Sequence, residues 1–335
     1  MNYSISIIGC GSWGTAIAQA LARQGYEVML YSRRSEQVRH IRDKRINSDY
    51  FPEIVLSNNI AATDDLKKAL RGKEYIFISV PTSATAELMA EIEDHIPSES
   101  TIISTAKGID VESFKTNSEL IAEYVENPLA VLSGPTHAEE VIKELPSAAV
   151  IASHSRKVAE DLQKLISDRR FRIYTNQDVR GVELGGAIKN IIALAAGISD
   201  GLGYGDNARA ALITRGLAEI ARLGEELGAA TLTFSGLTGL GDLVVTCNST
   251  HSRNRTFGYK IGEGKDKKTA LEEVGQVVEG IKSTEAVYRQ KVRGNISAEM
   301  PITEEIYGVL FEGKDPLTAV DELMTRDPKT ELGSR

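Results

Sequence analysis

Hydrophobic and polar positions follow two alternating patterns through the first half of the chain. Short apolar runs rich in β-branched and aromatic residues are separated by stretches whose apolar residues recur at helical spacing, as Ala16, Ile17, Ala20 and Leu21 do. This alternation predicts a mostly parallel sheet covered by helices on both faces. The expected strands lie, between residues 3 and 175, within YSISIIG, EVMLYS, EYIFISV, TIISTAKG, LAVLSGP, SAAVIAS and FRIYT.

The pattern changes near residue 178. Long helical stretches follow, such as VRGVELGGAIKNIIALAAGI and NARAALITRGLAEIARLGEELG, and no run favours a strand. A chain of 335 residues is also longer than most single domains. We therefore expect an α/β protein with a Rossmann-like, doubly wound, mostly parallel sheet in residues 1–177. An all-helical domain should follow in residues 178–335.

Composition excludes several classes of protein. Hydrophobic residues make up 41% and charged residues 26%, which is typical of soluble globular proteins. The net charge of −8 argues against a nucleic-acid-binding protein. Cys10 and Cys247 stand alone, which indicates neither a disulfide framework nor a metal site. We see no signal peptide and no apolar stretch long enough to span a membrane, so we expect a cytoplasmic protein without membrane insertion.

The segment GCGSWG, residues 9–14, has the G-x-G-x-x-G spacing at the point where a strand should turn into a helix. There Gly9 allows a tight turn, Gly11 lets the backbone approach a pyrophosphate, and Gly14 lets the helix pack on the strand. The helix N-terminus adds free N–H groups and the positive end of its dipole. The pattern predicts a dinucleotide site; a glycine turn that serves only chain reversal is the alternative.

The end of the second strand indicates which dinucleotide binds. Enzymes that bind NAD commonly have an acidic residue there, whereas this chain has Ser32, Arg33 and Arg34. Hydroxyl and guanidinium donors at this place suit a 2′-phosphate. NADPH (NADP) is therefore favoured, with NADH (NAD) possible. The alternative is that both arginines only solvate the start of the next helix.

Two lysines are candidates for chemistry. Lys189 lies in an otherwise apolar helical stretch behind Gly185 and Gly186, where burial would lower its affinity for a proton. The alternative is a side chain whose charged end reaches water. Lys107 follows the strand TIISTA at the end where open α/β sheets place ligands. The alternative is that Lys107 is only a solvent-exposed residue at a strand end.

Asp242 and the segment SRN at residues 252–254 are further candidates. Asp242 follows the glycine-rich GLTGLG and can be read as a helix N-cap. The SRN segment precedes a helical stretch, so that arginine, hydroxyl and backbone N–H groups can converge on one phosphate. A solvated basic loop is the alternative reading of this segment.

Six segments carry a resemblance to a known family through their order and their spacing along the chain. They are GCGSWGTA, STAKG at 104–108, SGPTHAEE at 133–140, GGAIKNIIA at 185–193, GLGDLVVTC at 239–247 and HSRN at 251–254. On these segments, which span nearly the whole chain, it resembles the bacterial type of NAD(P)-dependent glycerol-3-phosphate dehydrogenase. The resemblance implies reduction of dihydroxyacetone phosphate to sn-glycerol 3-phosphate, the backbone of phospholipids. It also implies a small phosphorylated triose as substrate, and we expect a homodimer.

The resemblance also implies roles for individual residues. Lys189 would be the acid and base, Lys107 a second cation that touches substrate and cofactor, and Asp242 the group that orients both lysines. The remaining substrate-binding residues would be Gly134, Thr136, Asn190, Thr246, Ser252, Arg253 and Asn254, with Arg253 the main phosphate anchor. The cofactor would contact Gly9, Gly11, Ser12, Trp13, Gly14, Arg33, Arg34, Ala138, Arg253, Val277 and Glu279. Trp13 can instead, or in addition, pack the glycine loop onto the second domain.

Two other functions fit the same two-domain pattern. One is a different Rossmann reductase, of the hydroxy-acid or 6-phosphogluconate type, which acts on a carboxylate. The other is an NADPH-binding sensor without catalysis. The HSRN and GLGDL segments argue against the first. The four charged residues Lys107, Lys189, Asp242 and Arg253 argue against the second, because a non-catalytic protein has no physical reason to bury cations.

Overall fold

The apolar runs of the first half form one eight-stranded sheet in the computed structural model, which describes residues 3–328 and 330–331. The strand order is β3-β2-β1-β4-β5-β6-β7-β8, and every neighbouring pair is parallel except β6 with β7. The mostly parallel, doubly wound sheet is thus confirmed. The strands are β1 (Ser4–Ile8), β2 (Glu27–Tyr31), β3 (Ile60–Thr63), β4 (Tyr75–Ile78), β5 (Thr101–Ser104), β6 (Leu129–Ser133), β7 (Ser147–Ala152) and β8 (Phe171–Asn176).

Strand β3 is the one strand of this sheet that the apolar pattern did not predict. It has four residues, IAAT, and pairs only with β2 at the edge of the sheet. Its two alanines carry little of the β-branched signal by which strands are recognised. The apolar pattern therefore predicts a connecting segment at residues 60–63.

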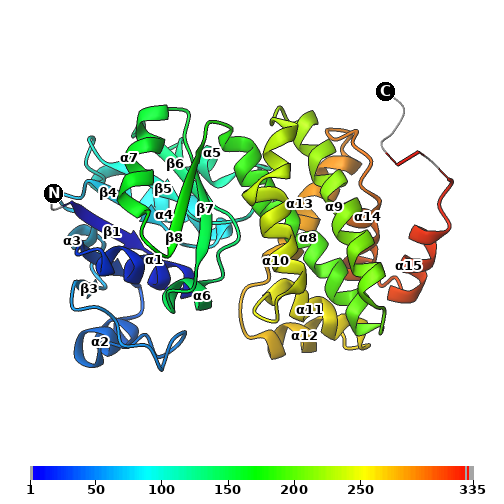
Figure 1. Cartoon of the computed structure of the whole chain (residues 1–335), viewed down its shortest axis with the longest axis horizontal. Helices are drawn as coiled ribbons and strands as arrows, with labels where there is room; N and C mark the ends of the chain where they lie inside the picture. The colour runs from blue at the N-terminus through cyan, green and yellow to red at the C-terminus, as the bar shows by residue number, and fades with distance from the viewer. Residues whose placement is uncertain (1–2, 329, 332–335) are drawn as a thin grey trace.

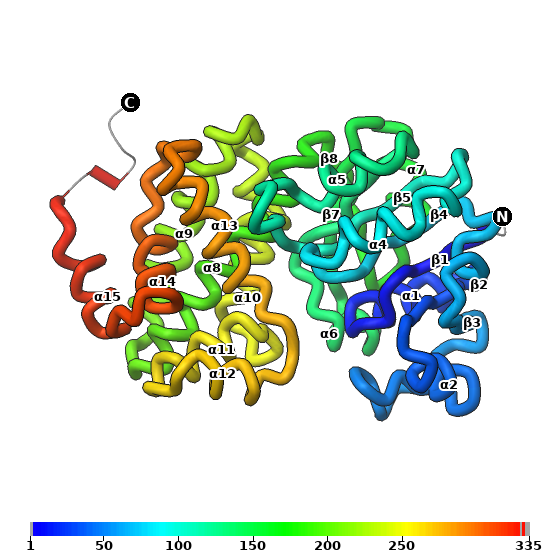
Figure 2. The backbone as a smooth tube through the Cα atoms, turned by 180° about the vertical axis from the view of Figure 1, so that it is seen from behind, coloured from blue at the N-terminus to red at the C-terminus, as the bar shows by residue number. Residues whose placement is uncertain are grey.

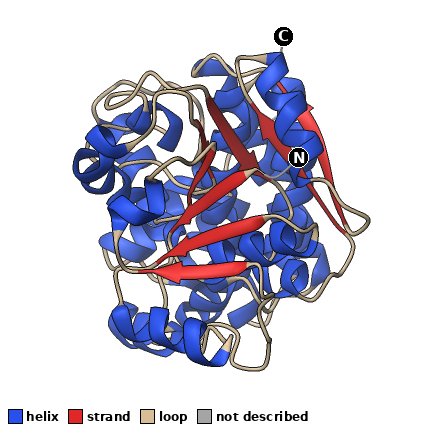
Figure 3. Ribbon diagram, turned by 90° about the vertical axis from the view of Figure 1, so that its left-hand side faces the viewer, coloured by secondary structure: helices blue, strands red, loops and turns tan. Residues whose placement is uncertain are grey.

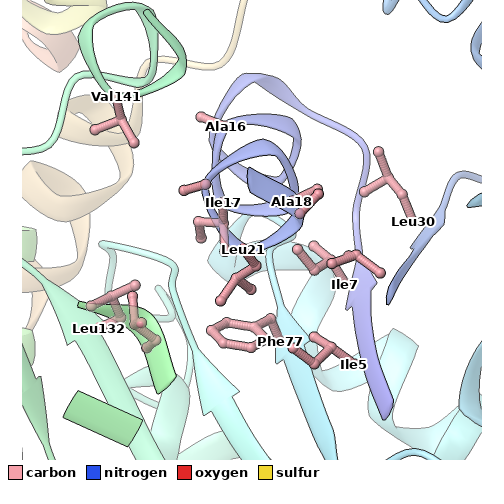
Figure 4. Close-up of a cluster of buried hydrophobic side chains, with 14 of the residues drawn as sticks. Ile5, Ile7, Ala16, Ile17, Ala18, Leu21, Leu30, Phe77, Leu132 and Val141 are labelled. Carbon is pink, nitrogen blue, oxygen red and sulfur yellow. The ribbon is translucent and has the colours of Figure 1, made fainter. Parts of the chain in front are cut away.

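Helices cover both faces of the sheet, and Figure 3 shows the strands fanned between them. Helix α1 packs its apolar face onto the strands, and Figure 4 shows Ile17 and Leu21 pointing toward Ile7 of β1 and Phe77 of β4. These four side chains are almost completely buried. The helices of this domain are α1 (Ser12–Arg23), α2 (Ser35–Lys44), α3 (Leu66–Leu70), α4 (Thr85–Ile92), α5 (Asn117–Ile121), α6 (Ala138–Ile142) and α7 (Arg156–Ile166), with short 3-10 turns η1 (Thr82–Ala84) and η2 (Glu93–His95).

The second half of the chain forms a separate helical body beside the sheet domain (Figures 1 and 2). Within its described residues there is no strand, as expected. Its helices are α8 (Val179–Gly201), α9 (Asp206–Glu226), α10 (Asp242–Asn248), α11 (Arg253–Gly262), α12 (Lys267–Val274), α13 (Glu279–Val292), α14 (Pro301–Phe311) and α15 (Pro316–Met324), with the short turns η3 (Thr231–Ser235) and η4 (Leu237–Gly241). The expected domain limits also include residues 1–2, 329 and 332–335, which lie outside the described residues.

Helix α8 is the centre of the helical domain. Contrary to the sequence expectation, this helix of 23 residues is long and apolar enough to cross a membrane, but its most apolar window is wholly buried inside the structure. Such burial is typical of the core helix of a domain. Because α8 contacts α9, α10, α11, α13 and α14, any side chain on it lies close to several other elements.

Helices α8 and α11 cross with their backbones in contact. A Cβ atom on Gly197 of α8 would lie 2.1 Å from the carbonyl oxygen of Arg255, and one on Gly258 of α11 would lie 2.2 Å from that of Leu194. Glycine is therefore required at this crossing for close approach. The contact fixes the position of α11 relative to α8.

Candidate active site

Two lysines and one aspartate meet between the two domains. Lys107 follows β5, Lys189 lies on α8, and Asp242 is the first residue of α10. Lys107 Nζ lies 2.9 Å from Asp242 Oδ2, while Lys189 Nζ donates to Asp242 Oδ1. Three elements distant in sequence thus place two cations on the two oxygens of one carboxylate.

Lys189 is buried, with 5% of its surface exposed. Its ammonium also donates to Thr246 Oγ1 at 2.7 Å, one helical turn after Asp242. The alternative in which the charged end of Lys189 reaches water therefore does not hold. Gly185 and Gly186 permit this packing, because a Cβ on Gly185 would lie 2.6 Å from the carbonyl oxygen of Thr238 and one on Gly186 2.7 Å from Ser133 Oγ.

Burial and charge shift the protonation equilibria of this cluster. Burial, opposed by Asp242 and reinforced by the charge of Lys107, lowers the pKa of Lys189 to about 7. Burial alone would raise the pKa of Asp242, but the charges of Lys107 and Lys189 outweigh it and lower that pKa. An ionised Asp242 between two protonated lysines leaves one positive charge in excess. Such a pocket can stabilise an oxygen on which negative charge develops.

The loop after β6 completes the surroundings of Lys107. Its Nζ donates to the carbonyl oxygen of Gly134 at 2.7 Å and lies 3.4 Å from Thr136 Oγ1. Gly134 has a φ of +138°, a conformation that other residues rarely adopt, and it lies against Ala149 of β7. Gly134 and Thr136, which the resemblance gave as substrate-binding residues, thus lie beside Lys107 at the end of β6.

Two asparagines connect the helices around the cluster. Asn190 Nδ2 donates to the backbone carbonyl of Lys107 at 3.3 Å, and its Oδ1 accepts from Asn254 Nδ2 at 2.9 Å. Asn254 Oδ1 accepts in turn from the backbone N–H of Gly280 at 2.8 Å. Both predicted substrate-binding asparagines are thus also structural links between the end of β5, α8, α11 and α13.

The start of α11 carries the predicted phosphate donors. Ser252 is its N-cap: its Oγ accepts from the backbone N–H of Arg255 at 3.2 Å, which leaves its hydroxyl proton available to another acceptor. Arg253 is exposed at the first position of the helix. The positive end of the helix dipole adds to the charge of Arg253.

The glycine loop between β1 and α1 has the shape that a pyrophosphate requires. Gly9 has a φ of +118° and lies against the carbonyl oxygen of Ser79. A Cβ on Gly14 would lie 2.0 Å from the carbonyl oxygen of Gly9, whereas one on Gly11 would point into open space. Gly11 is the N-cap of α1 and supplies no side-chain cap, so N–H groups at the helix start, Ser12 included, remain available for an anion. The loop therefore fits a dinucleotide.

Trp13 packs within the first domain. Its indole lies edge-on against Phe171 of β8, with ring centroids 6.4 Å apart. The alternative in which Trp13 packs the loop onto the second domain is therefore wrong. Apolar side chains of its own domain hold the indole, because the loop and β8 lie close together there.

The end of β2 differs in detail from the sequence expectation. Arg33 and Arg34 are exposed, and Arg34 pairs with Asp49 at 2.8 Å. The hydroxyl of Ser32 is buried and donates to Gln37 Oε1 at 2.7 Å, so it is not a free donor for a phosphate. The two guanidinium groups remain as the donors at this strand end.

The remaining predicted cofactor residues come from both domains. Ala138 is buried at the start of α6, and Val277 is exposed just before α13. Glu279 begins α13, and its Oε2 would lie 3.2 Å from a Cβ on Gly108 of the first domain. Burial raises the pKa of Glu279, an effect that Lys282 and Arg253 oppose. Glu279 of the second domain therefore lies close to Gly108 of the first domain.

His137 is a residue at this site that the sequence analysis did not single out. It is the N-cap of α6, and its ring centroid lies 6.1 Å from that of His251, which precedes Ser252. Burial, together with the charges of Lys189 and Lys107, lowers its pKa. Its position inside SGPTHAEE, directly after a strand, was the only signal in the sequence.

Comparison with known proteins identifies the family that shares this site. Residues 4–159 match the model of the N-terminal domain of NAD-dependent glycerol-3-phosphate dehydrogenase, and residues 178–321 match that of its C-terminal domain. The glycerol-3-phosphate dehydrogenase (NAD(P)+) of Halothermothrix orenii is 54% identical over 99% of this chain and 97% of its own.

Solved structures give the same result. The crystal structure of glycerol-3-phosphate dehydrogenase from Coxiella burnetii superimposes with a TM-score of 0.93 at 42% identity, over 97% of this chain and 99% of its own. The corresponding enzyme of Plasmodium falciparum, at 26% identity, has a TM-score of 0.90 over 98% of this chain and 97% of its own. Both similarities cover the two domains.

Proposed function

Because the chain belongs to the NAD-dependent glycerol-3-phosphate dehydrogenase family, we propose that it reduces dihydroxyacetone phosphate at the cluster of Lys107, Lys189 and Asp242. The product is sn-glycerol 3-phosphate, and the protein is an NAD(P)-dependent oxidoreductase. The observation that carries the placement of the reaction is the pairing of the buried Lys189 and the partly buried Lys107 with one carboxylate. The substrate is a ketone that carries a phosphate, so the pocket needs no group that binds a substrate carboxylate.

Lys189 is the proton donor to the ketone. A nicotinamide held in this site would supply the hydride, and the ketone oxygen would then gain negative charge. A lysine with a pKa of about 7 can release its proton to that oxygen at neutral pH and take one back in the reverse direction. Asp242 and Thr246 orient the ammonium, while Lys107, held by Gly134 and Asp242, remains a cation beside the same oxygen.

The substrate's phosphate binds at the start of α11. Ser252 offers its hydroxyl proton there, Arg253 its guanidinium, and the helix its first N–H groups. Asn190 and Asn254 hold α11 and α8 together at this end and contribute donors to the substrate. The pocket is thus positively charged at both ends, which suits a dianion that gains further negative charge during reaction.

The first domain, residues 1–177, binds the dinucleotide, and residues 178–335 bind the substrate. Gly9, Gly11, Ser12, Trp13 and Gly14 would hold the pyrophosphate, and Lys107, Ala138, Arg253, Val277 and Glu279 would lie at the nicotinamide end. Arg33 and Arg34 make NADPH the preferred cofactor, because guanidinium groups pair well with a 2′-phosphate. The exposure of both arginines at the end of β2 supports this preference for NADPH.

The cellular role follows from the product. The enzyme supplies sn-glycerol 3-phosphate to glycerophospholipid biosynthesis in the cytoplasm, and it works as a homodimer. Exposed apolar side chains on α15, Leu317 and Met324, are the kind of surface that a second copy would cover. Light scattering of the purified protein measures the oligomeric state directly; a monomer at all concentrations would contradict the dimer.

The test of the function is turnover. Purified protein should oxidise NADPH when dihydroxyacetone phosphate is added, followed by the absorbance of the reduced nicotinamide, and more slowly with NADH. Parallel assays should use a hydroxy acid with NADP and 6-phosphogluconate with NADP. Faster turnover of either compound than of the triose phosphate would overturn the proposal.

A further inference from the structure

His137 lies between the two ends of the proposed substrate pocket. Its loop also carries Thr136, which is 3.4 Å from Lys107 Nζ at the ketone end. The ring centroid of His251 lies 6.1 Å from that of His137, and His251 immediately precedes Ser252 at the phosphate end. The imidazole of His137 therefore comes from the first domain but faces the start of α11 in the second.

One nitrogen of this ring has no partner. His137 Nε2 is buried, and among the residues that the structure describes it forms no hydrogen bond. Leaving a buried polar atom unpaired costs free energy, so proteins pair nearly all of them. A buried, unpaired nitrogen beside a substrate pocket is explained if the substrate itself is the partner.

The surroundings of the ring determine what it can offer. Burial and the charges of Lys189 and Lys107 lower the pKa of His137, and the carboxylates of Asp242 and Glu139 only partly oppose this. Among the described residues, His251 also faces the His137 ring. The imidazole is therefore neutral at pH 7, and a neutral imidazole donates from one nitrogen and accepts on the other. It can supply an N–H donor without adding a third cation to the cluster.

We propose that His137 is a substrate-binding residue whose Nε2–H donates to a phosphate oxygen of the bound triose. This inference rests on the proposed orientation of the substrate, with its ketone at Lys189 and its phosphate at Ser252 and Arg253. The ketone oxygen already has two lysines, whereas the phosphate has three terminal oxygens to satisfy. A contact from the first domain would also couple binding of the phosphate to the approach of the two domains.

The decisive experiment compares two substitutions. His137→Phe keeps an aromatic ring and removes the donor, whereas His137→Gln keeps an N–H donor. We expect His137→Phe to raise KM for dihydroxyacetone phosphate about tenfold, the usual effect of losing a hydrogen bond to a charged group, with kcat changed less than about twofold. His137→Gln should recover most of the affinity. The matched control is His154→Phe, at an exposed position in the loop after β7, which should behave like the wild type.

A second substrate shows which end of the molecule His137 touches. Dihydroxyacetone lacks the phosphate, so kcat/KM for it should be the same in the wild type and in His137→Phe. An equal penalty on both ketones would overturn the assignment to the phosphate. An unchanged KM for the phosphorylated ketone, or a His137→Gln variant as impaired as His137→Phe, would overturn the hydrogen bond itself.

The wild-type protein provides a test that requires no variant to fold. With histidine labelled by ¹⁵N, binding of glycerol 3-phosphate in the presence of NADPH should shift the Nε2 resonance of His137 and leave that of His154 unchanged. Absence of a shift in His137 would count against the proposal. Turnover of dihydroxyacetone phosphate by the wild type is a separate result: if it is absent the proposed function fails, and if it is present while the His137 effects are absent only this inference fails.

Discussion

The ammonium of Lys189 is a group whose protonation should set the pH dependence of the reaction. Its pKa is lowered to about 7, so the fraction protonated falls as pH rises through that value. Reduction of the ketone needs the protonated form and should slow above about pH 7, whereas oxidation of glycerol 3-phosphate needs the neutral form and should accelerate over the same interval. The measurement is kcat in both directions from pH 5.5 to 9, roughly spanning that pKa. Parallel profiles in the two directions would contradict the assignment.

Replacing Lys189 by methionine keeps most of the side-chain volume and removes the proton donor. We expect kcat to fall about 10² to 10⁴-fold, the usual contribution of general acid catalysis, while the Kd for NADPH without substrate stays near that of the wild type. Lys164→Met, at an exposed position on α7, is the matched control. If Lys189→Met retains kcat and Lys107→Met abolishes it, the roles of the two lysines are reversed.

Arg33 and Arg34 should distinguish the two cofactors. Replacing both by alanine should raise KM for NADPH at least about tenfold and change KM for NADH less than about twofold, because only NADPH has the 2′-phosphate. Arg39→Ala, an exposed arginine on α2 that pairs with Glu36, controls for the general loss of positive charge. An equal effect on the two cofactors would show that the arginines do not bind the 2′-phosphate.

At the scale of the element, the crossing of α8 and α11 positions both ends of the proposed substrate pocket. Gly258→Ala would place a Cβ 2.2 Å from a backbone carbonyl of α8, so the helices must separate. Overpacking of this kind costs about 1–3 kcal/mol of the free energy of unfolding. The lowered thermal midpoint should be accompanied by a raised KM for dihydroxyacetone phosphate. Gly205→Ala, where a Cβ meets open space, is the control; equal midpoints for the two variants would contradict this packing.

Elements with a strong local signal could be predicted from the sequence, and those without one could not. The seven apolar runs and α8 are long and periodic enough to identify, whereas β3 is a four-residue edge strand with two alanines. The site shows the same division. Lys189 stands out as a cation in an apolar helix, but the burial of His137 depends on neighbours such as Lys189 of α8 and His251 before α11, which only the tertiary structure brings to it. Trp13 likewise packs on Phe171, far away in sequence.

At the scale of the whole molecule, the site belongs to neither domain alone. The largest hydrophobic clusters lie mostly within single domains, and the pair of Lys107 with Asp242 is one of the contacts between the domains. NADPH and glycerol 3-phosphate cannot react with each other, so they can be added together. Each ligand alone at 100 times its Kd should stabilise the protein by about 2.7 kcal/mol. Together they should raise the thermal midpoint by more than the sum of their separate effects, because each orders a surface that the other contacts.

Calorimetry with each ligand and with both provides that comparison. Purely additive shifts would mean that the two domains bind their ligands independently. The variant Asp242→Asn, which weakens the connection between Lys107 and the second domain, should reduce the excess stabilisation.

The crossing of α8 and α11 has one more consequence. Lys189 is on one of these helices and the proposed phosphate donors begin the other, and the two backbones touch at Gly197 and Gly258. The span between proton donor and phosphate anchor is therefore set when the domain folds. A ketone can react only if its own carbon chain covers that span, so a homologue one carbon longer or shorter should be rejected. On the proposed assignment of the two ends, main-chain contact between α8 and α11 would thus make the enzyme select its substrate by length.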